Sequence, residues 1–334
     1  MSHIFDALQR AQGEDSENES SLPAPAIEVL RNEERKAATK WELGSLAAKD
    51  KSRDRLNPEG LTAVSEQPQN GSGITANLNY GDTAKQIQAD IFDQFPKLKV
   101  SVSAQERLVC LTDTESLPAE AFRLLGVRLR NLRQKRSLKK VLITSSIPKE
   151  GKTMTATNLA CTLSASTKQR VLLLDGDLRR PSVAQKFGLG NLTGLSEWLQ
   201  GADSRIPNIY HLDEPGLWLL AAGTASTNAL ELLQSPRLPA LMDQLADWFD
   251  WIFIDSPPIL PLADTSVWMR MADGILVVAR QGTTEKHQLQ RGLEAIDQKK
   301  IIGALLNCSR NSAHDNYYYH YVPKPSQHER ASKS

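Results

Sequence analysis

Between Arg107 and Arg310, short runs of leucine and β-branched residues alternate with stretches of helical spacing. Short apolar runs bounded by polar residues are typical of buried strands, and strands that alternate with helices favour a parallel sheet. The chain is therefore expected to have an α/β fold, with a mostly parallel sheet flanked by helices on both faces. The predicted strands are residues 108–111, 141–144, 171–174, 217–221, 251–254, 275–279 and 301–306.

One predicted helix lies between the first two runs. Its sequence, SLPAEAFRLLGVRLRNLRQKR, has Pro118 where a first helical turn tolerates proline. Four apolar side chains follow at helical spacing and mark one buried face: Phe122, Leu125, Leu129 and Leu132. The arginines and lysines of this helix are expected to face solvent.

The rest of the chain has a different texture. Residues 1–12 have apolar positions at helical spacing and predict a short amphipathic helix. Residues 13–103 are rich in Glu, Ser, Asn, Lys and Pro and predict a largely disordered linker. The α/β domain is expected over 104–310, and residues 311–334 are expected to form a flexible, tyrosine-rich tail.

Composition excludes several classes of function. The 334 residues include 40 basic and 39 acidic side chains, so no broad basic surface is expected and nucleic acid is not an expected partner. The three cysteines form no C-x-x-C pair and are expected to be reduced thiols. No apolar run is long enough for a transmembrane segment, so the chain is expected to be cytoplasmic.

A candidate phosphate-binding loop follows the run VLIT. The sequence SSIPKEGKT lies where a strand turns into a helix, which is the context of a P-loop. A βα turn that merely contains GKT remains the alternative, because Ser146 stands where the usual pattern has its first glycine. The expected nucleotide-binding residues are Pro148, Lys149, Glu150, Gly151, Lys152, Thr153 and Met154.

Carboxylates follow two other buried runs. Asp175 and Asp177 come after VLLL, and Asp255 comes after WIFI. Ligands in open α/β sheets bind at this end of the strands. Asp177 and Asp255, with the Thr153 hydroxyl, are candidate Mg²⁺ ligands, and Arg179 is expected to balance the charge of the first two acids. The alternative is a solvated turn with Arg179 as a surface partner.

Together these motifs resemble the bacterial tyrosine kinases, over roughly residues 116–321. The family combines a P-loop ending in E-G-K-[ST], a D-x-D-x-R box and a Walker B motif of the form D-x-x-P, in that order. The resemblance implies a P-loop NTPase fold that uses ATP and Mg²⁺. It also implies catalytic roles for Lys152, Asp175, Asp177 and Asp255, with Asp175 accepting the phenolic proton. Arg179 and Asn307 are implied to contact the nucleotide, Asn307 at the adenine.

The chain departs from the family pattern at two positions. Lys149 stands where relatives usually have glycine, so it could bind nucleotide or crowd it. In the E-x-x-R-x-x-R segment that helps such kinases to assemble, Glu120 and Arg123 match but Gly126 replaces the last arginine. The resemblance nevertheless implies self-association and a separate membrane activator, a polysaccharide co-polymerase, which would hold the chain at the inner face of the plasma membrane.

The tail DNYYYHYVPK supplies candidate phosphate acceptors, namely Tyr317, Tyr318, Tyr319 and Tyr321. Consecutive tyrosines cannot all face one interior, so the alternative is a docking tail. The expected function is an ATP-dependent tyrosine autokinase that regulates exopolysaccharide or capsule synthesis and export.

Two other functions are possible from the sequence. One is a regulatory ATP-binding subunit of an export system with little kinase activity. The other is an ATPase of the partition or division-site type, although those proteins carry a lysine near the start of the P-loop, where this chain has Ile147.

Overall fold

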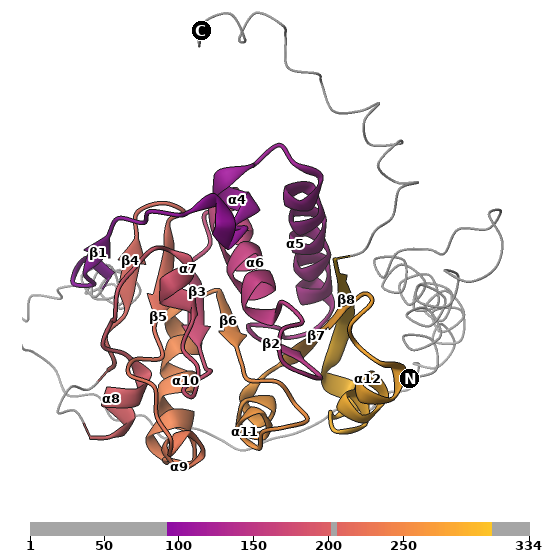
Figure 1. The fold of residues 1–334 in the computed structure, drawn as a ribbon. Coiled ribbons are helices and arrows are strands. Elements are labelled where there is room, and N and C mark those ends of the chain that lie inside the picture. Colours follow the sequence, from indigo (N-terminus) through magenta and orange to yellow (C-terminus); the bar gives the residue numbers. More distant parts are fainter. Residues whose placement is uncertain (1–91, 202–205, 309–334) are drawn as a thin grey trace, which may run out of the picture. The chain divides into compact units, whose positions relative to one another are not determined.

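In the computed structural model of the protein, residues 92–201 and 206–308 are described, and eight strands of this part form one sheet (Figure 1). Everything described from Phe95 onward belongs to one compact unit, and residues 92–94 end a second one. The strands, in sheet order, are β1 (Lys97–Leu98), β4 (Tyr210–Leu212), β5 (Leu217–Leu220), β3 (Val171–Asp175), β6 (Trp251–Asp255), β2 (Lys140–Ser145), β7 (Gly274–Arg280) and β8 (Ile301–Asn307).

The sheet is mostly parallel. Every neighbouring pair from β5 through β3, β6, β2 and β7 to β8 is parallel, and β4 is antiparallel to β5. The remaining strand, β1, lies at one side of the sheet and runs parallel to β4. The predicted fold class is confirmed, and six of the predicted strands correspond to β2, β3, β5, β6, β7 and β8.

Helices cover both faces of the sheet. Val141, Leu173 and Phe253 of the central strands pack with α5 and α6, whereas the residues that alternate with them are buried on the face of α10 and α11. No helix of the described residues is long and apolar enough to span a bilayer. The helices are α4 (Val109–Thr112), α5 (Leu117–Lys135), α6 (Lys152–Ser166), α7 (Val183–Lys186), α8 (Leu195–Leu199), α9 (Ala229–Leu233), α10 (Arg237–Trp248), α11 (Asp264–Met271) and α12 (Lys286–Glu294), with 3-10 turns η1 (Ala104–Glu106) and η2 (Gln298–Lys300).

The predicted helix after Ser116 is confirmed as α5. The Ser116 hydroxyl accepts a hydrogen bond from the Ala119 N–H and caps the helix, with proline in the first turn. Phe122, Leu125 and Leu129 are buried. α5 lies beside α6 (Figure 1), so these side chains cover the helix that follows the P-loop.

One predicted strand is wrong. Residues 108–111 lie at α4 instead of in the sheet. Leu108 is fully buried in the core under α5 and α6, and the Asn158 side chain accepts from Cys110 N–H and donates to the Arg107 carbonyl. An apolar run of this length does not distinguish strand from helix, and here tertiary contacts select the helix.

The sheet also begins earlier than predicted. β1 and the buried Phe95 precede residue 104, where the domain was expected to start, and Ser101 N–H donates to the Phe187 carbonyl. β1 and β4 were missed because two- and three-residue strands carry almost no periodicity. The predicted helix at 1–12, the linker up to residue 91 and the tail at 311–334 lie outside the described residues.

Candidate nucleotide and magnesium site

Three loops meet at the carboxyl edge of the sheet. β2, which leads into the P-loop, lies beside β6, and Ile143 pairs in register with Asp255. On the other side of β6, Asp175 at the end of β3 also pairs with Asp255. Strand register alone therefore brings the P-loop and both acidic motifs to one place.

Gly151 allows the P-loop to join α6. Its φ of 95° lies in the left-handed region that favours glycine, and it is the N-cap residue of the helix. A Cβ at this position would lie 2.1 Å from the Asn307 amide nitrogen. α6 then begins at Lys152, so its unpaired backbone N–H groups and positive dipole end lie where a phosphate can bind.

Lys149 also adopts a conformation that favours glycine. Its φ is 68°, one of three positive values at non-glycine residues in the described chain. Left-handed backbone costs an L-residue about 1–2 kcal/mol. The resemblance described above implies glycine at this position, and the left-handed backbone is a physical reason for it.

Glu150 braces the loop from inside. The residue is fully buried, and its carboxylate accepts from the Ile147 N–H at 2.9 Å and from the Thr284 hydroxyl. Burial raises the pKa of this carboxyl above its usual value, and these hydrogen bonds act in the opposite direction. The side chain is thus engaged within the protein, which leaves contact with a nucleotide to the backbone.

Asn307 lies against the same loop. Its side-chain amide donates to the Glu150 carbonyl at 2.9 Å, and its oxygen accepts from the Cys308 N–H. The residue at the end of β8 is therefore brought to the P-loop, as a nucleotide-contacting residue must be. The predicted adenine contact stays a prediction.

The Lys152 ammonium lies near the acids of the D-x-D motif. Its Nζ is 3.8 Å from Asp177 Oδ2, and both side chains are largely buried. Burial raises the pKa of Asp177, and the Lys152 charge opposes that shift. This places one ammonium group and one carboxylate beside the phosphate-binding loop.

Asp175 is held by backbone groups. One of its oxygens accepts from the Asp177 N–H at 3.2 Å, and the other accepts from Ser182 and Val183 N–H, each at 3.0 Å. Burial raises its pKa to about 6, even though these hydrogen bonds favour the ionised form. The carboxylate thus fixes the loop that follows β3.

Among the acids of the site, Asp255 has the fewest hydrogen bonds to offset the burial of its carboxylate. It is fully buried, and neither oxygen has a hydrogen-bond partner, although the Thr153 hydroxyl lies near enough to lower its pKa. Burial raises the pKa to about 7, and the Lys152 charge opposes the shift. Such a group needs a cation or ordered water.

These residues fit a magnesium ion. Mg²⁺ prefers oxygen ligands, and proteins usually bind it through one or two carboxylates, with water and phosphate completing the shell. Asp177, Asp255 and the Thr153 hydroxyl supply such oxygens. Within the described residues no group of three or more histidine, cysteine or acidic side chains is preformed as a metal cage.

The expected partner of Arg179 is corrected by the structure. Its guanidinium donates to both oxygens of Asp264, at 2.6 and 3.1 Å, and to the Thr227 carbonyl at 3.2 Å. Asp264, at the start of α11, is almost fully buried and was missed. An acidic residue in a first helical turn looks like an ordinary helix-dipole partner, so this pair could not be predicted from local pattern.

Ser146, in place of the first P-loop glycine, is accommodated by a glycine elsewhere. Its hydroxyl is buried without a hydrogen-bond partner. A Cβ on Gly292 of α12 would lie 2.4 Å from that oxygen. The Ser146 side chain therefore occupies space that Gly292 leaves open.

Comparison with known proteins finds similar chains among tyrosine-protein kinases. No family profile matches the chain. The tyrosine-protein kinase YwqD of Bacillus subtilis is 34% identical over 218 residues, which are 65% of this chain and 92% of YwqD. The tyrosine-protein kinase Etk of Escherichia coli K12 is 32% identical over 202 residues, or 60% of this chain and 28% of Etk.

Solved structures agree. The kinase domain of E. coli Etk is 30% identical with a TM-score of 0.57, over 61% of this chain and 82% of that domain. The BceF tyrosine kinase domain is 27% identical with a TM-score of 0.53, over 68% of this chain and 88% of that domain. This chain therefore spans most of YwqD but only about a quarter of full-length Etk.

Proposed function

The chain belongs to the family of bacterial tyrosine kinases, and from that premise we propose that it transfers the γ-phosphoryl group of ATP to tyrosines of its own C-terminal segment. The observation that carries this proposal is the meeting of Lys152, Asp177 and Asp255 beside the P-loop, with both Asp255 oxygens unpartnered. Such a site offers oxygen ligands to a cation and an ammonium group to phosphate oxygens.

The P-loop binds the triphosphate. The backbone of residues 148–153 and the start of α6 surround the phosphates, and the Lys152 ammonium neutralises charge on the transferred group. Met154 and Asn307 border the loop, and Arg179 supports it from the D-x-D-x-R side. Because Arg179 is paired with Asp264, its contribution is to position that loop rather than to carry free positive charge to the phosphates.

The Thr153 hydroxyl and the carboxylates of Asp177 and Asp255 would hold the metal. When bound, Mg²⁺ neutralises charge on the phosphates during transfer. Burial of Asp255 keeps water away from this point. The electrostatic attraction between the carboxylate and a bound cation is therefore stronger than it would be in water.

Asp175 accepts the proton. The phenolic oxygen attacks the γ-phosphorus, the bond to the bridging oxygen of ADP breaks, and the phenolic proton passes to Asp175. A carboxyl with a pKa of about 6 is ionised at neutral pH and is a better base than an ordinary aspartate. Phosphoryl transfer has a loose transition state, so modest assistance suffices.

Phosphorylation of the tail regulates an assembly. Each phosphate adds about −1.5 to −2 charge, so several on Tyr317, Tyr318, Tyr319 and Tyr321 repel one another. Unmodified tails dock in the site of a neighbouring subunit and phosphorylated tails leave it. This cycle, together with a membrane co-polymerase as activator, controls polysaccharide synthesis and export. The clustering of these four tyrosines within five positions of the sequence supports the proposal.

A second candidate is ATP binding with little transfer. The observation that favours it is the hydrogen bonding of Asp175, whose two oxygens already accept three backbone N–H groups. In this alternative Asp175 has a structural role only, and the chain reports nucleotide state to its partner.

One experiment separates the two candidates. The purified chain is incubated with Mg·ATP and an activator fragment, and phosphotyrosine is mapped by mass spectrometry. Transfer predicts phosphate on the tail tyrosines, lost in Asp175→Asn with nucleotide still bound. A chain that binds ATP and gains no phosphotyrosine would contradict the first candidate. Unchanged labelling in Asp175→Asn would contradict the role of that residue.

A further inference from the structure

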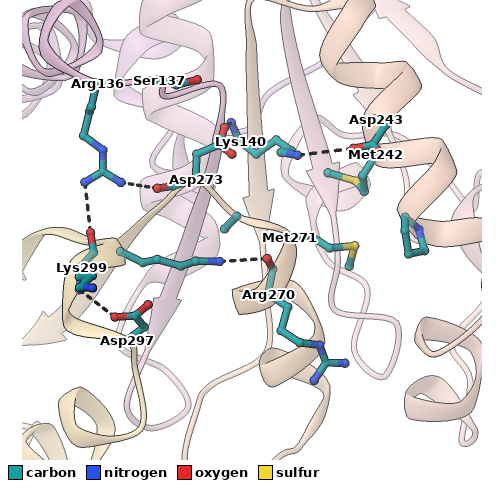
Figure 2. A pocket seen from close by; sticks show the side chains of 13 residues that line it. Arg136, Ser137, Lys140, Met242, Asp243, Arg270, Met271, Asp273, Asp297 and Lys299 are labelled. Carbon is teal, nitrogen blue, oxygen red and sulfur yellow. Dashed lines mark hydrogen bonds and ion pairs between the residues drawn. The ribbon is translucent and has the colours of Figure 1, made fainter.

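A cavity of about 580 Å³ lies where β2, β7 and β8 begin, at the opposite edge of the sheet from the P-loop. Figure 2 shows the side chains that line it. Its walls come from the segments that enter β2, β7 and β8 and from α10. The lining residues used below are Arg136, Lys140, Arg270, Lys299, Lys300 and the apolar Met242. Nothing in the proposed transfer reaction uses this cavity, although its volume suits a small ligand or a side chain.

Cations dominate the cavity and largely lack counter-ions. Arg136, Arg270, Lys299 and Lys300 form no ion pair in the described chain. Arg136 donates instead to the carbonyls of Asp273 and Lys299 (Figure 2). Lys300 donates to carbonyls at the end of α11. Carbonyls satisfy the hydrogen bonding of Arg136 and Lys300 and leave the charge of these two side chains unbalanced.

Lys140 adds a fifth cation. Its side chain is only 17% exposed, and its one carboxylate partner, Asp243, is 3.9 Å away and 81% exposed. The other two acids of the lining are already engaged, because Asp273 accepts from the Lys139 and Lys140 N–H groups and Asp297 accepts from the Lys299 N–H. The cavity is therefore suited to an anion.

The apolar lining narrows the class of anion. Pro239, Met242, Met271 and Ala272 line the same cavity. Methionine sulfur packs favourably on aromatic rings, and arginine binds phosphate through paired N–H groups. A ring that carries a dianion matches both parts of this lining, whereas free phosphate or phosphoserine matches one. A flat lipid surface cannot enter a concave site.

We propose that this cavity binds phosphotyrosine of the chain's own C-terminal segment, an inference that rests on the proposed function. Chain length permits it. β8 has seven residues and spans roughly 23 Å, and Tyr317 follows Cys308 by nine positions, a reach of roughly 30 Å when extended. Capture here holds the phosphorylated tail at the edge away from the ATP site.

The test uses the full chain with its tail tyrosines changed to phenylalanine, so that no tail competes. A labelled DNYYYHYVPK peptide phosphorylated at Tyr319 is titrated and followed by fluorescence anisotropy. Arg270→Ala/Lys299→Ala removes two exposed cations whose side chains pair with nothing among residues 92–201 and 206–308, and about tenfold or greater weakening is expected. Lys168→Ala/Arg291→Ala removes two exposed cations outside the cavity and should bind as the parent does.

Several outcomes overturn the inference. They are equal binding of the unphosphorylated peptide, equal binding by the Arg270→Ala/Lys299→Ala variant, or equally tight binding of a phosphoserine peptide or inorganic phosphate. Vesicles containing phosphatidylglycerol form another arm: charge-dependent vesicle binding without peptide binding would indicate a lipid site. Because the phosphate is supplied synthetically, these results do not depend on kinase activity. Autophosphorylation without peptide binding would contradict phosphotyrosine binding in the cavity and leave the proposed kinase function intact.

A second arm distinguishes capture of a chain's own tail from capture of another chain's tail. The autophosphorylated wild-type protein is treated with a tyrosine phosphatase at several protein concentrations. Capture within one chain predicts slow dephosphorylation that is independent of concentration and faster in Arg270→Ala/Lys299→Ala. Protection that grows with protein concentration would contradict it.

Discussion

At the scale of single residues, Asp255 and Lys149 each have a feature that destabilises the folded protein. Asp255 is a buried carboxylate whose oxygens make no hydrogen bond, and its pKa is raised to about 7. Lys149 holds a left-handed backbone that glycine would adopt more easily. Both features lie where phosphates and a cation would bind, so ligand contacts can offset what they cost the free protein.

Asp255→Asn should stabilise the free protein at pH 8 while weakening Mg·ATP binding. The folded pKa is above the unfolded one, so the ionised carboxylate destabilises the fold fully above about pH 7, and this effect disappears below the unfolded value. Removing the charge should therefore raise the free energy of unfolding at pH 8 by about 1–3 kcal/mol. Urea denaturation checks this, and a less stable variant at pH 8 would contradict the account.

The same shifts predict a pH dependence for the wild-type protein. Mg·ATP affinity should fall as pH decreases from 8 to 6, because Asp255 gains a proton and loses the charge that holds the metal. In the absence of ligand, Asp255 and Asp175 should favour folding increasingly over the same decrease. Calorimetric titration at several pH values measures the first effect, and an affinity that stays constant would count against metal binding by Asp255.

Lys149→Gly and Lys149→Ala together separate backbone strain from charge. Both remove the ammonium, but only glycine relieves the φ of 68°. The glycine variant should be more stable than the alanine variant by about 1 kcal/mol. Equal stability in urea denaturation would show that the loop tolerates the left-handed conformation without strain.

At the scale of elements, α12 and the P-loop fit one another through Ser146 and Gly292. A glycine inside a helix costs about 1 kcal/mol relative to alanine. Here it leaves space for a serine that P-loops usually replace with glycine. Neither residue is explained alone, because each accommodates the other.

Gly292→Ala should destabilise the protein by about 1–3 kcal/mol, because the new Cβ meets the Ser146 side chain. In a Ser146→Gly background the same change should be neutral or stabilising, since the space is then open and alanine favours helix. The free energies of unfolding of the four proteins form a double-mutant cycle. Additive effects would disprove the coupling.

Some of the helices, strands and site contacts could be predicted from the sequence alone, and others could not. The central strands and α5 follow from periodicity, and the meeting of Asp175 and Asp255 follows from parallel strands ending at one edge. Pairings between distant segments carry no such signal. The Arg179–Asp264 pair, the inward position of Glu150 and the helical state of residues 108–111 depend on tertiary packing, which local pattern does not encode.

At the scale of the whole chain, the described sheet has two edges of different chemistry. The carboxyl edge holds the P-loop and the buried acids, and the amino edge holds the cationic cavity. The tail tyrosines follow β8, the last strand, which connects these edges. In the proposed switch, the tail is phosphorylated at the carboxyl edge and is then bound by the cationic cavity at the amino edge.

The most direct test of the account is a crystal structure of the chain with Mg²⁺ and a non-hydrolysable ATP analogue. The predicted result is a metal about 2.0–2.2 Å from the Thr153 hydroxyl, bound by Asp177 and Asp255 directly or through water, with Lys152 on the terminal phosphates. A nucleotide bound elsewhere, or a metal that neither acid approaches, would contradict the central claim.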